Sequence, residues 1–417
     1  MQILGIVAEY NPFHNGHLHL IEEAKKYQHF DAVVGIMSGN FMQRGEPAVC
    51  SKWARAEMAL RCGMDLVIEL PFIYAVRSAY YFARGAIESL SRTGIVSHLG
   101  FGSESGNLEQ LKQIARVIAF EPADYRSILK EHLALGLSYP AARARALNDY
   151  LGHTGLEIEG LLLGPNNILA LEYLRVIEEM KLPLHPLTVS RKGRSYHDPS
   201  LSTATLASAT AIRRALFEHQ NFEDIQVNMP QASWEVLRQA IDSGQAPVLP
   251  DSLEQAILSR LRTLSIHEIK QLYEVTEGLE YRIYEASQSC GTLAGLRQHI
   301  KSRRYSLTRI NRILLYSLFG VSSSLVDELD KEGPTYLHIL GFSNQGKQIL
   351  KEINYRSSMR VLNRGKDVKS FYEENKGYPS GYMLELDIKA TDIYSLLMPD
   401  PAARTAARDY TTSPVTI

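Results

Sequence analysis

Two histidines that flank a glycine near the start of the chain carry the clearest chemical signal. The apolar run Ile3 to Ala8 leads directly into Glu9-Tyr10-Asn11-Pro12-Phe13-His14-Asn15-Gly16-His17, which predicts a strand, a turn and the start of a helix. A helix N-terminus attracts phosphate through its unpaired N–H groups and partial positive charge, and two imidazoles add donors there. Gly16 leaves room for a ligand against the backbone. The segment therefore predicts a phosphate site, and two ordinary hydrogen-bonded histidines are the alternative that the short string leaves open.

A second candidate phosphate site is the segment Ser208-Ala209-Thr210-Ala211-Ile212-Arg213, which precedes a predicted helix. Its hydroxyl groups, its free N–H groups and the guanidinium of Arg213 suit a polyphosphate. The alternative is a simple helix cap, because serine and threonine are common at that position.

The loop Ser38 to Pro47 follows the second predicted strand and carries Asn40, Gln43 and Arg44, where a second substrate would fit. Lys52 and Arg55 begin the next helix. For each of these cations, a solvated charged face is an equally good interpretation.

Three further segments suit a nucleoside. Gly102, in Phe101-Gly102-Ser103-Glu104, lets a nucleoside approach the backbone at a strand end. The amides of Asn166 and Asn167 at a helix start can read both the donor and the acceptor edges of a purine. Arg191, after the fifth predicted strand, suits phosphate or stacking on adenine. A helix cap or a surface cation is the alternative for each.

The elements that position these residues alternate between short apolar runs and helical patterns, which predicts a parallel α/β sheet. Ligands of such sheets bind outside the carboxyl ends of the strands, and the unusual residues fall there. Helices are predicted over His17–Tyr27 and Lys52–Cys62. The predicted strands are Ile3–Ala8, Ala32–Met37, Leu66–Leu70, His98–Phe101 and Leu184–Val189.

After about residue 220 the sequence has few β-branched runs and shows long helical patterns instead. This change predicts an α/β domain over 1–220 and a mainly helical domain over 221–417. Tyr336–Gly341 and Met383–Asp387 are expected to be short strands, and Thr405–Ile417 to be a strap on the body. Helices are predicted over Leu253–Thr263, Ile266–Tyr273 and Leu279–Ser289.

Composition limits the function classes. With 417 residues, 45% hydrophobic residues and a net charge of −1, the chain is an ordinary globular protein and not a uniformly basic nucleic-acid binder. Cys50, Cys62 and Cys290 show no metal-binding spacing, so no protein metal site is predicted, and their odd number suits a reducing compartment. No signal peptide or membrane span is expected, because the longest apolar run is interrupted by Glu69, and the predicted location is cytoplasmic.

A local basic stretch is nevertheless present between Arg297 and Tyr316, which contains no acidic residue. Cations interleaved with tyrosines are typical of RNA loop recognition, whereas a solvated helix face is the alternative. The cations are Arg297, Lys301, Arg303, Arg304, Arg309 and Arg312.

Longer strings carry a family resemblance. HNGH and SATAIR resemble the HIGH-type nucleotidyltransferase superfamily. With AEYNPFHNGH, SGNFMQRGEPA, DLVIELPF, FGSE, PNNILALEY and DIKATDIY, the chain from Ala8 to about Tyr394 resembles the bacterial tRNA(Met) cytidine acetate ligase family. This resemblance implies a Rossmann-like nucleotidyltransferase domain over 1–220, which binds ATP and is catalytic, and a mainly helical tRNA-binding domain over 221–417.

The resemblance also implies an activity. Acetate would be activated by ATP to acetyl-adenylate and then transferred to N4 of the wobble cytidine of elongator tRNA(Met), with His14, His17 and Arg213 as catalytic residues and Mg²⁺ as a cofactor. Asn11 stands where many superfamily members have aspartate, so no Mg²⁺ ligand is assigned. The tRNA would contact the basic stretch. The expected ATP contacts are Val7, Ala8, Glu9, Tyr10, Asn11, Pro12, Phe13, His14, Asn15, Gly16, His17, Leu20, Gly102, Asn166, Asn167, Arg191, Ser208 and Thr210.

Acyl adenylation depends on positioning and on cationic stabilisation of the departing pyrophosphate, and it needs no enzyme nucleophile. Two other functions stay open. A small-molecule adenylyltransferase would use the same ATP site, and a non-catalytic, nucleotide-sensing RNA-binding factor would bind ATP without releasing pyrophosphate.

Overall fold

The computed structural model describes residues 1–152, 158–190, 207–218, 221–302 and 304–417. One sheet of eight strands forms its centre, with the order β5-β4-β1-β2-β3-β6-β7 and with β8 beside β6. The five strands from the first half of the chain are parallel and confirm the predicted strands, with shifts of one or two residues at some ends. They are β1 (Ile3–Ala8), β2 (Ala32–Ser38), β3 (Leu66–Leu70), β4 (His98–Ser103) and β5 (His185–Ser190).

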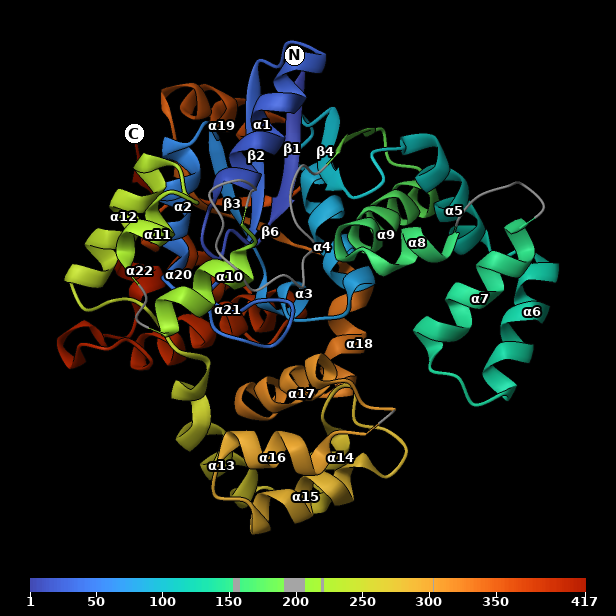
Figure 1. Ribbon diagram of the computed structural model, residues 1–417. Coiled ribbons are helices and arrows are strands. Elements are labelled where there is room, and N and C mark those ends of the chain that lie inside the picture. The colour runs from blue at the N-terminus through green and yellow to red at the C-terminus, as the bar shows by residue number, and fades with distance from the viewer. Residues whose placement is uncertain (153–157, 191–206, 219–220, 303) are drawn as a thin grey trace.

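The central strands lie where the sequence is apolar at all but one or two positions, with Ser38 and Glu69 as the polar residues. Every residue of β2 and β3 is buried, because helices cover both faces of the sheet (Figure 1). Their carboxyl ends lie at the same edge, and the chain turns there into the loops that carry the candidate site residues.

The last part of the chain returns to this sheet. β6 (Tyr336–Phe342) pairs antiparallel with β3, and both β7 (Arg360–Leu362) and β8 (Val415–Thr416) pair parallel with β6. The strand expected at Tyr336–Gly341 is therefore confirmed. The division at residue 220 stays a prediction, and the sheet takes strands from both sides of it.

The strand expected at Met383–Asp387 is wrong. These residues lie inside α21 (Pro379–Leu396), and five of the six residues from Met383 to Ile388 are buried. The buried face of this helix is wide and only a narrow stripe with Tyr382 and Lys389 is exposed, so the short segment shows an apolar run without helical period. The expected strap contains α22 (Arg408–Thr411) and β8, which lies on the sheet.

Helices pack on both faces and around the edges of the sheet (Figure 1). The helices α6 and α7 form a hairpin that projects to one side. The helices of the α/β part are α1 (Asn15–Tyr27), α2 (Lys52–Arg61), α3 (Phe72–Ala75), α4 (Ala79–Arg92), α5 (Leu108–Phe120), α6 (Ala123–Ala134), α7 (Tyr139–Leu151), α8 (Ile158–Leu163), α9 (Pro165–Met180), α10 (Ala209–Phe217), α11 (Phe222–Gln226), α12 (Gln231–Asp242), α19 (Asn344–Arg356) and α20 (Gly365–Glu374).

A compact group of helices lies below the sheet in the view of Figure 1, and we call it the helical lobe. It joins the α/β part through buried polar contacts: the Tyr316 hydroxyl donates to the Val76 carbonyl at 2.5 Å, and the buried Arg77 pairs with Asp330 at 2.6 Å. The lobe consists of α13 (Glu254–Thr263), α14 (Ile266–Gln271), α15 (Leu279–Ser289), α16 (Leu293–Ile300) and α17 (Leu307–Phe319). The next helix, α18 (Ser323–Glu332), packs against α21 and connects the lobe to the α/β part. Helices α13, α14 and α15 confirm the three helices predicted in this region.

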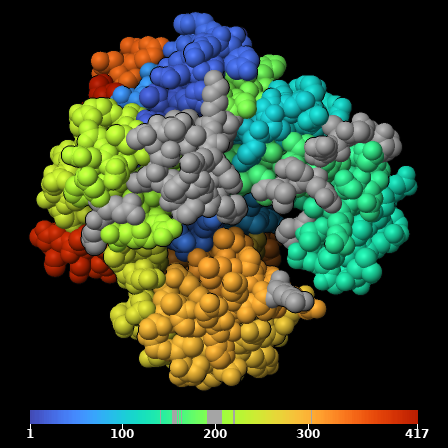
Figure 2. Space-filling view, in the orientation of Figure 1, coloured from blue at the N-terminus to red at the C-terminus, as the bar shows by residue number. Residues whose placement is uncertain are grey.

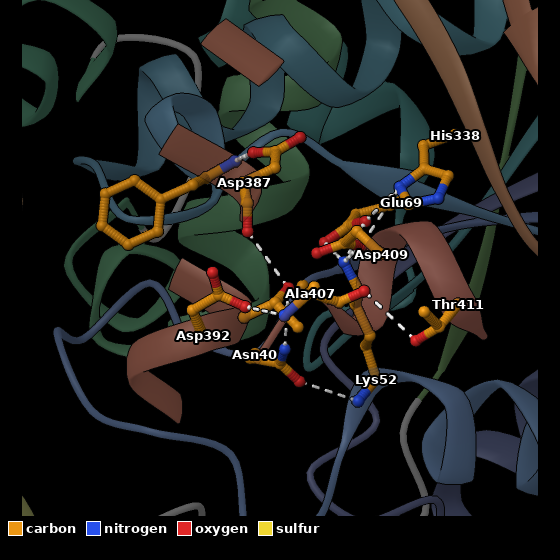
Figure 3. Close-up of polar contacts among 12 residues, drawn as sticks. Asn40, Lys52, Glu69, His338, Asp387, Asp392, Ala407, Asp409 and Thr411 are labelled. Carbon is orange, nitrogen blue, oxygen red and sulfur yellow. Dashed lines mark hydrogen bonds and ion pairs between the residues drawn. The ribbon is translucent and has the colours of Figure 1, made fainter. Parts of the chain in front are cut away.

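A buried ion cluster fixes the returning segment to the sheet (Figure 3). The Lys52 ammonium lies 2.7 Å from Glu69 and 2.6 Å from Asp409, and His338 lies 2.7 Å from the same Glu69 carboxylate. Glu69, His338 and Asp409 are close enough to share a metal ion, but the ammonium already supplies the positive charge between the two carboxylates. The cluster therefore has a structural role.

The solvated charged face that the sequence allowed for Lys52 and Arg55 is wrong, because both side chains are buried, and Asn40 is buried beside them. The buried Arg55 donates to the carbonyls of Glu9 at 2.6 Å and Ser38 at 3.1 Å. Asn40 accepts from the Lys52 N–H at 2.9 Å. All three hold the loops at the carboxyl edge of the sheet.

Asp387 provides a test of this buried polar region. Its carboxyl accepts from the Phe72 N–H and from the Tyr336 hydroxyl, each at 2.6 Å. Burial and the nearby negative charge of Glu69 raise its pKa well above the usual range, so folding favours the neutral acid and stability falls as pH rises above the unfolded pKa. Asp387→Asn should therefore melt at the same or a higher temperature at pH 8, and its advantage should shrink toward pH 4. A fall in Tm of more than about 3 °C at pH 8 would contradict this account.

Candidate functional site

A cavity of about 440 Å³ opens at the carboxyl ends of β1 and β4, where the topology of the sheet predicts a ligand site. Its wall combines the end of β1 and the start of α1, the loop after β2, Gly102, the start of α9, the start of α10 and one side of α17. The predicted site residues on this wall are Val7, Ala8, Glu9, Tyr10, Asn11, His14, Gly16, His17, Leu20, Gly102, Asn166, Ser208 and Arg213.

The two histidines form the cap of α1. His14 is the N-cap residue and its Nδ1 accepts from the Gly16 N–H at 3.0 Å, while Nδ1 of His17 accepts from the His14 N–H at 3.2 Å. A neutral imidazole that accepts at Nδ1 carries its proton on Nε2. Each ring on the cavity wall is therefore set up as a donor through Nε2, which is the polarity that a phosphate needs.

The turn between β1 and α1 is held by contacts from distant segments. Tyr10 has a left-handed φ of +47°, and the side-chain oxygen of Asn11 accepts from the Val49 N–H at 2.8 Å. The Asn11 carbonyl accepts from Arg213 at 2.7 Å. Asn11 thus uses its amide oxygen to position a loop, and Arg213 links the two predicted phosphate segments.

The helix α10 presents its N-terminus to the cavity. Ser208 is its N-cap and accepts from the Ala211 N–H at 3.2 Å, while Thr210 accepts from Arg213 at 3.3 Å. Two helix N-termini, those of α1 and α10, thus meet at one cavity. The charged side chains on the wall are those of Arg44, Arg213 and Arg312 together with Glu9 and Glu46, and Arg312 is paired with Glu274.

Asn166 and Asn167, the two asparagines near Gly102, have different roles. Asn166 lies on the cavity wall and donates to Glu104 at 2.6 Å. Asn167 is buried, and its side-chain oxygen accepts from the N–H groups of Glu104 at 2.9 Å and Ser105 at 3.3 Å. Asn167 therefore shapes the loop after β4 rather than facing the cavity.

Some predicted contacts lie behind the cavity wall. Phe13 is in the core, and Asn15 donates away from the cavity to the Val227 carbonyl at 3.1 Å. Pro12 and Thr210 also lie off the wall in the part of the chain that the structure describes. Arg191 lies outside the described residues.

The sequence did not single out several residues of the cavity wall. Glu46 lay inside a loop that the sequence marked, so a search for carboxylates there would have found it. Phe82, Tyr173 and Thr308 carry no local signal, because only the tertiary fold brings them to the cavity. Burial, together with the nearby charge of Glu9, raises the pKa of Tyr173, so this phenol stays neutral.

The basic stretch is not free of counter-charges in three dimensions. Arg297 lies 3.3 Å from Asp251, Arg304 lies 3.2 Å from Glu277, and Arg312 lies 3.0 Å from Glu274. The acidic partners come from other segments, so the sequence of the stretch does not show them.

The members of the stretch also differ in exposure. Lys301 and Arg304 are exposed, whereas Arg312 is buried and lines the cavity. Arg309 donates to the Glu274 carbonyl at 2.6 Å, and Arg303 lies outside the described residues. Only part of the stretch therefore presents charge to an external partner. Among the described residues, no helix has the length and apolar character needed to cross a membrane.

Comparisons with known proteins agree with this geometry. The family model described as HIGH Nucleotidyl Transferase matches residues 1–409. The chain is 55% identical to the tRNA(Met) cytidine acetate ligase of Syntrophomonas wolfei, over 100% of this chain and 99% of the relative, and 41% identical to that of Halothermothrix orenii, over 98% of each.

Solved structures give the same result. The apo crystal structure of Thermotoga maritima TmcAL has a TM-score of 0.94 at 34% identity and covers 100% of both chains. The TmcAL structure bound with alpha-thio ATP has a TM-score of 0.92 at 34% identity, over 100% of this chain and 99% of that chain. The chain therefore belongs to the tRNA(Met) cytidine acetate ligase family of the HIGH nucleotidyltransferases.

Proposed function

We propose that this protein is an ATP-dependent ligase that converts acetate to acetyl-adenylate and transfers the acetyl group to N4 of the wobble cytidine of elongator tRNA(Met). The observation that carries this proposal is the cavity at which the N-termini of α1 and α10, two donor histidines and Arg213 converge. The names of the full-length relatives support the substrate, and the relative with bound alpha-thio ATP supports the nucleotide.

In this proposal the histidines and the start of α10 bind the triphosphate. The carboxylate of acetate attacks the α-phosphorus, the bond to pyrophosphate breaks, and negative charge builds on the departing oxygen. His14, His17 and Arg213 stabilise that charge as donors, without taking part covalently. Gly102 and Asn166 line the region where the nucleoside would lie.

Mg²⁺ is a further part of the proposal. The cation prefers carboxylate oxygens together with phosphate oxygens, and Glu9 supplies a carboxylate on the cavity wall beside the histidines. Bound there, Mg²⁺ would neutralise the triphosphate. One Glu9 oxygen accepts from the Gln43 N–H at 2.7 Å, which fixes the orientation of the carboxylate.

The tRNA is proposed to dock on the helical lobe, through Lys301 and Arg304 on its exposed face. In Figure 2 the lobe stands apart from the α6–α7 hairpin, and the surface is hollowed between them. An enzyme that uses ATP and tRNA would act in the cytoplasm.

The decisive experiment incubates the protein with ATP, Mg²⁺, labelled acetate and elongator tRNA(Met), and analyses the nucleosides. Label in N4-acetylcytidine that depends on ATP and not on coenzyme A is expected. A stable adenylylated metabolite would favour the adenylyltransferase alternative. ATP binding without pyrophosphate release would favour the nucleotide sensor.

The proposed RNA contact predicts a specific effect of salt. A double variant, Lys301→Ala with Arg304→Ala, should weaken tRNA binding about tenfold and reduce the slope of log K against log salt by about 1.5, because two phosphate contacts are lost. Filter binding from 50 to 200 mM salt measures both quantities, and ATP binding should not change. The control is Lys112→Ala on α5, which removes a half-buried cation paired with Glu109 outside the helical lobe. An unchanged slope would show that these two cations are merely solvated.

A further inference from the structure

One part of the cavity wall is not used by the proposed nucleotide contacts. It is formed by the loop between β2 and α2, which we call the 40–47 loop, and by the N-terminal half of α17. Its polar residues are Gln43, Arg44, Glu46, Thr308 and Arg312. Since α17 also belongs to the helical lobe, this wall faces the proposed tRNA side of the cavity.

The 40–47 loop has a fixed shape. The Met42 N–H donates to the Glu46 carbonyl at 2.8 Å, and the Gly45 N–H donates to the Met42 carbonyl at 2.9 Å. Gly45 has a φ of +75°, and a Cβ added there would lie 2.5 Å from the backbone nitrogen of Arg312. The loop therefore packs directly against the backbone of α17, which fixes the position of Glu46 relative to this helix.

Among the charged side chains on this part of the wall, Glu46 has the least engaged head group. Arg312 is held by Glu274 through two nitrogens, at 3.0 to 3.2 Å. Glu9, the other carboxylate of the cavity, accepts from the Gln43 N–H. No hydrogen bond or ion pair reaches the half-buried Glu46 carboxylate from the residues that the structure describes. Glu46 is therefore available to a ligand.

We propose that Glu46 is the catalytic base of the transfer step. This inference rests on the proposed function and names a residue for its second half-reaction. The N4 amine attacks the carbonyl carbon of acetyl-adenylate, and an N–C bond forms. The bond from that carbon to the phosphate oxygen breaks, and AMP leaves with the electron pair. The proton of N4 passes to the Glu46 carboxylate, and from there to water.

The chemistry of the acceptor needs such a group. The lone pair of the cytosine amine is delocalised into the ring, so the amine is a weak nucleophile, and its proton becomes acidic only as the new bond forms. A positioned carboxylate that takes this proton accelerates the step without affecting the earlier attack of acetate on ATP. Glu46 lies on the wall that a base arriving from the helical lobe would meet.

The test separates the two half-reactions of the full-length protein. Glu46→Gln should lower single-turnover acetyl transfer from preformed acetyl-adenylate to tRNA about a hundredfold or more. It should change acetate-dependent ATP–pyrophosphate exchange less than threefold and leave the KM for tRNA unchanged. Glu46→Asp should restore part of the transfer rate. The control is Glu109→Gln, the same change on the exposed face of α5.

The pH profile gives a second readout. Wild-type transfer should rise with pH through one ionisation and then level off, and Glu46→Gln should lose that rise. Transfer that survives in Glu46→Gln, or an equal loss in both half-reactions, would overturn the assignment. If the wild type shows no acetate-dependent exchange, the proposed function itself fails, and this outcome is distinct from a failure of the Glu46 assignment.

Discussion

Lys52→Met is expected to destabilise the protein by about 3–5 kcal/mol, because it leaves two buried carboxylates without their cation. The Lys52 side chain is fully buried between Glu69 and Asp409. For a chain of this size the change corresponds to a fall in Tm of about 3–6 °C, measured by calorimetry. The control is Lys389→Met, which removes an ion pair from the exposed face of α21 and should shift Tm by less than about 1 °C.

The pH dependence of this variant gives an independent check. Burial alone would raise the pKa of Glu69, but the ammonium of Lys52 and the contact with His338 outweigh burial and lower that pKa to about 2. A lowered pKa stabilises the folded state above the unfolded value, and the benefit is lost as pH falls through the folded value. In Lys52→Met the ammonium no longer opposes burial, so the pKa of Glu69 rises and its buried charge destabilises the variant at high pH. Protonation of Glu69 removes that charge, and the Tm difference from wild type should therefore shrink as the pH falls from 8 to 4. A constant difference would contradict the electrostatic account.

His17→Ala is expected to reduce acetate-dependent ATP–pyrophosphate exchange about a hundredfold to a thousandfold, because it removes a donor to the charge that develops on the departing pyrophosphate. The fold should survive, since His17 lies at the edge of the cavity and not in the core. Circular dichroism and Tm would verify this point. Near-normal exchange in a folded His17→Ala protein would exclude the proposed phosphate site.

The capping role of His17 can be separated from this donor role. In His17→Asn the side-chain oxygen can still accept from the His14 N–H, as Nδ1 does in the wild type at 3.2 Å, but the donor at Nε2 is lost. We therefore expect stability near wild type and exchange as low as in the alanine variant. Exchange that recovers in the asparagine variant would mean that the cap, and not the donor, supports activity.

The parallel strands were predictable because they are buried on both faces. Ala32–Met37 reads as an unbroken apolar run, and Leu66–Leu70 is apolar except for Glu69, which is the pattern of a covered sheet. Burial also explains the wrong strand at Met383–Asp387, because the wide buried face of α21 leaves only a narrow exposed stripe and this short segment shows no helical period. A short buried segment of a helix can therefore read as a strand.

The candidate site was predictable where its residues are close in sequence. The histidines of α1 and the cap of α10 are local motifs, and both lie at the cavity. The roles of Lys52 and Arg55 were not predictable from the sequence. The fold brings in the carboxylates that neutralise Lys52 and the backbone carbonyls that accept hydrogen bonds from Arg55. Asp409 follows Lys52 by hundreds of residues, and no local pattern connects them. Arg312 was expected to contact RNA, yet it lines the cavity.

The return of the chain to its own sheet also orders events during synthesis. Lys52 and Glu69 are made early, but Asp409 and β8 are added late. A nascent chain that stops before Asp409 therefore holds Lys52 opposite an incomplete set of counter-charges and leaves β6 without β8. Such incomplete chains should therefore be less stable than the full chain, because the counter-charge and the strand that complete the buried region are added last.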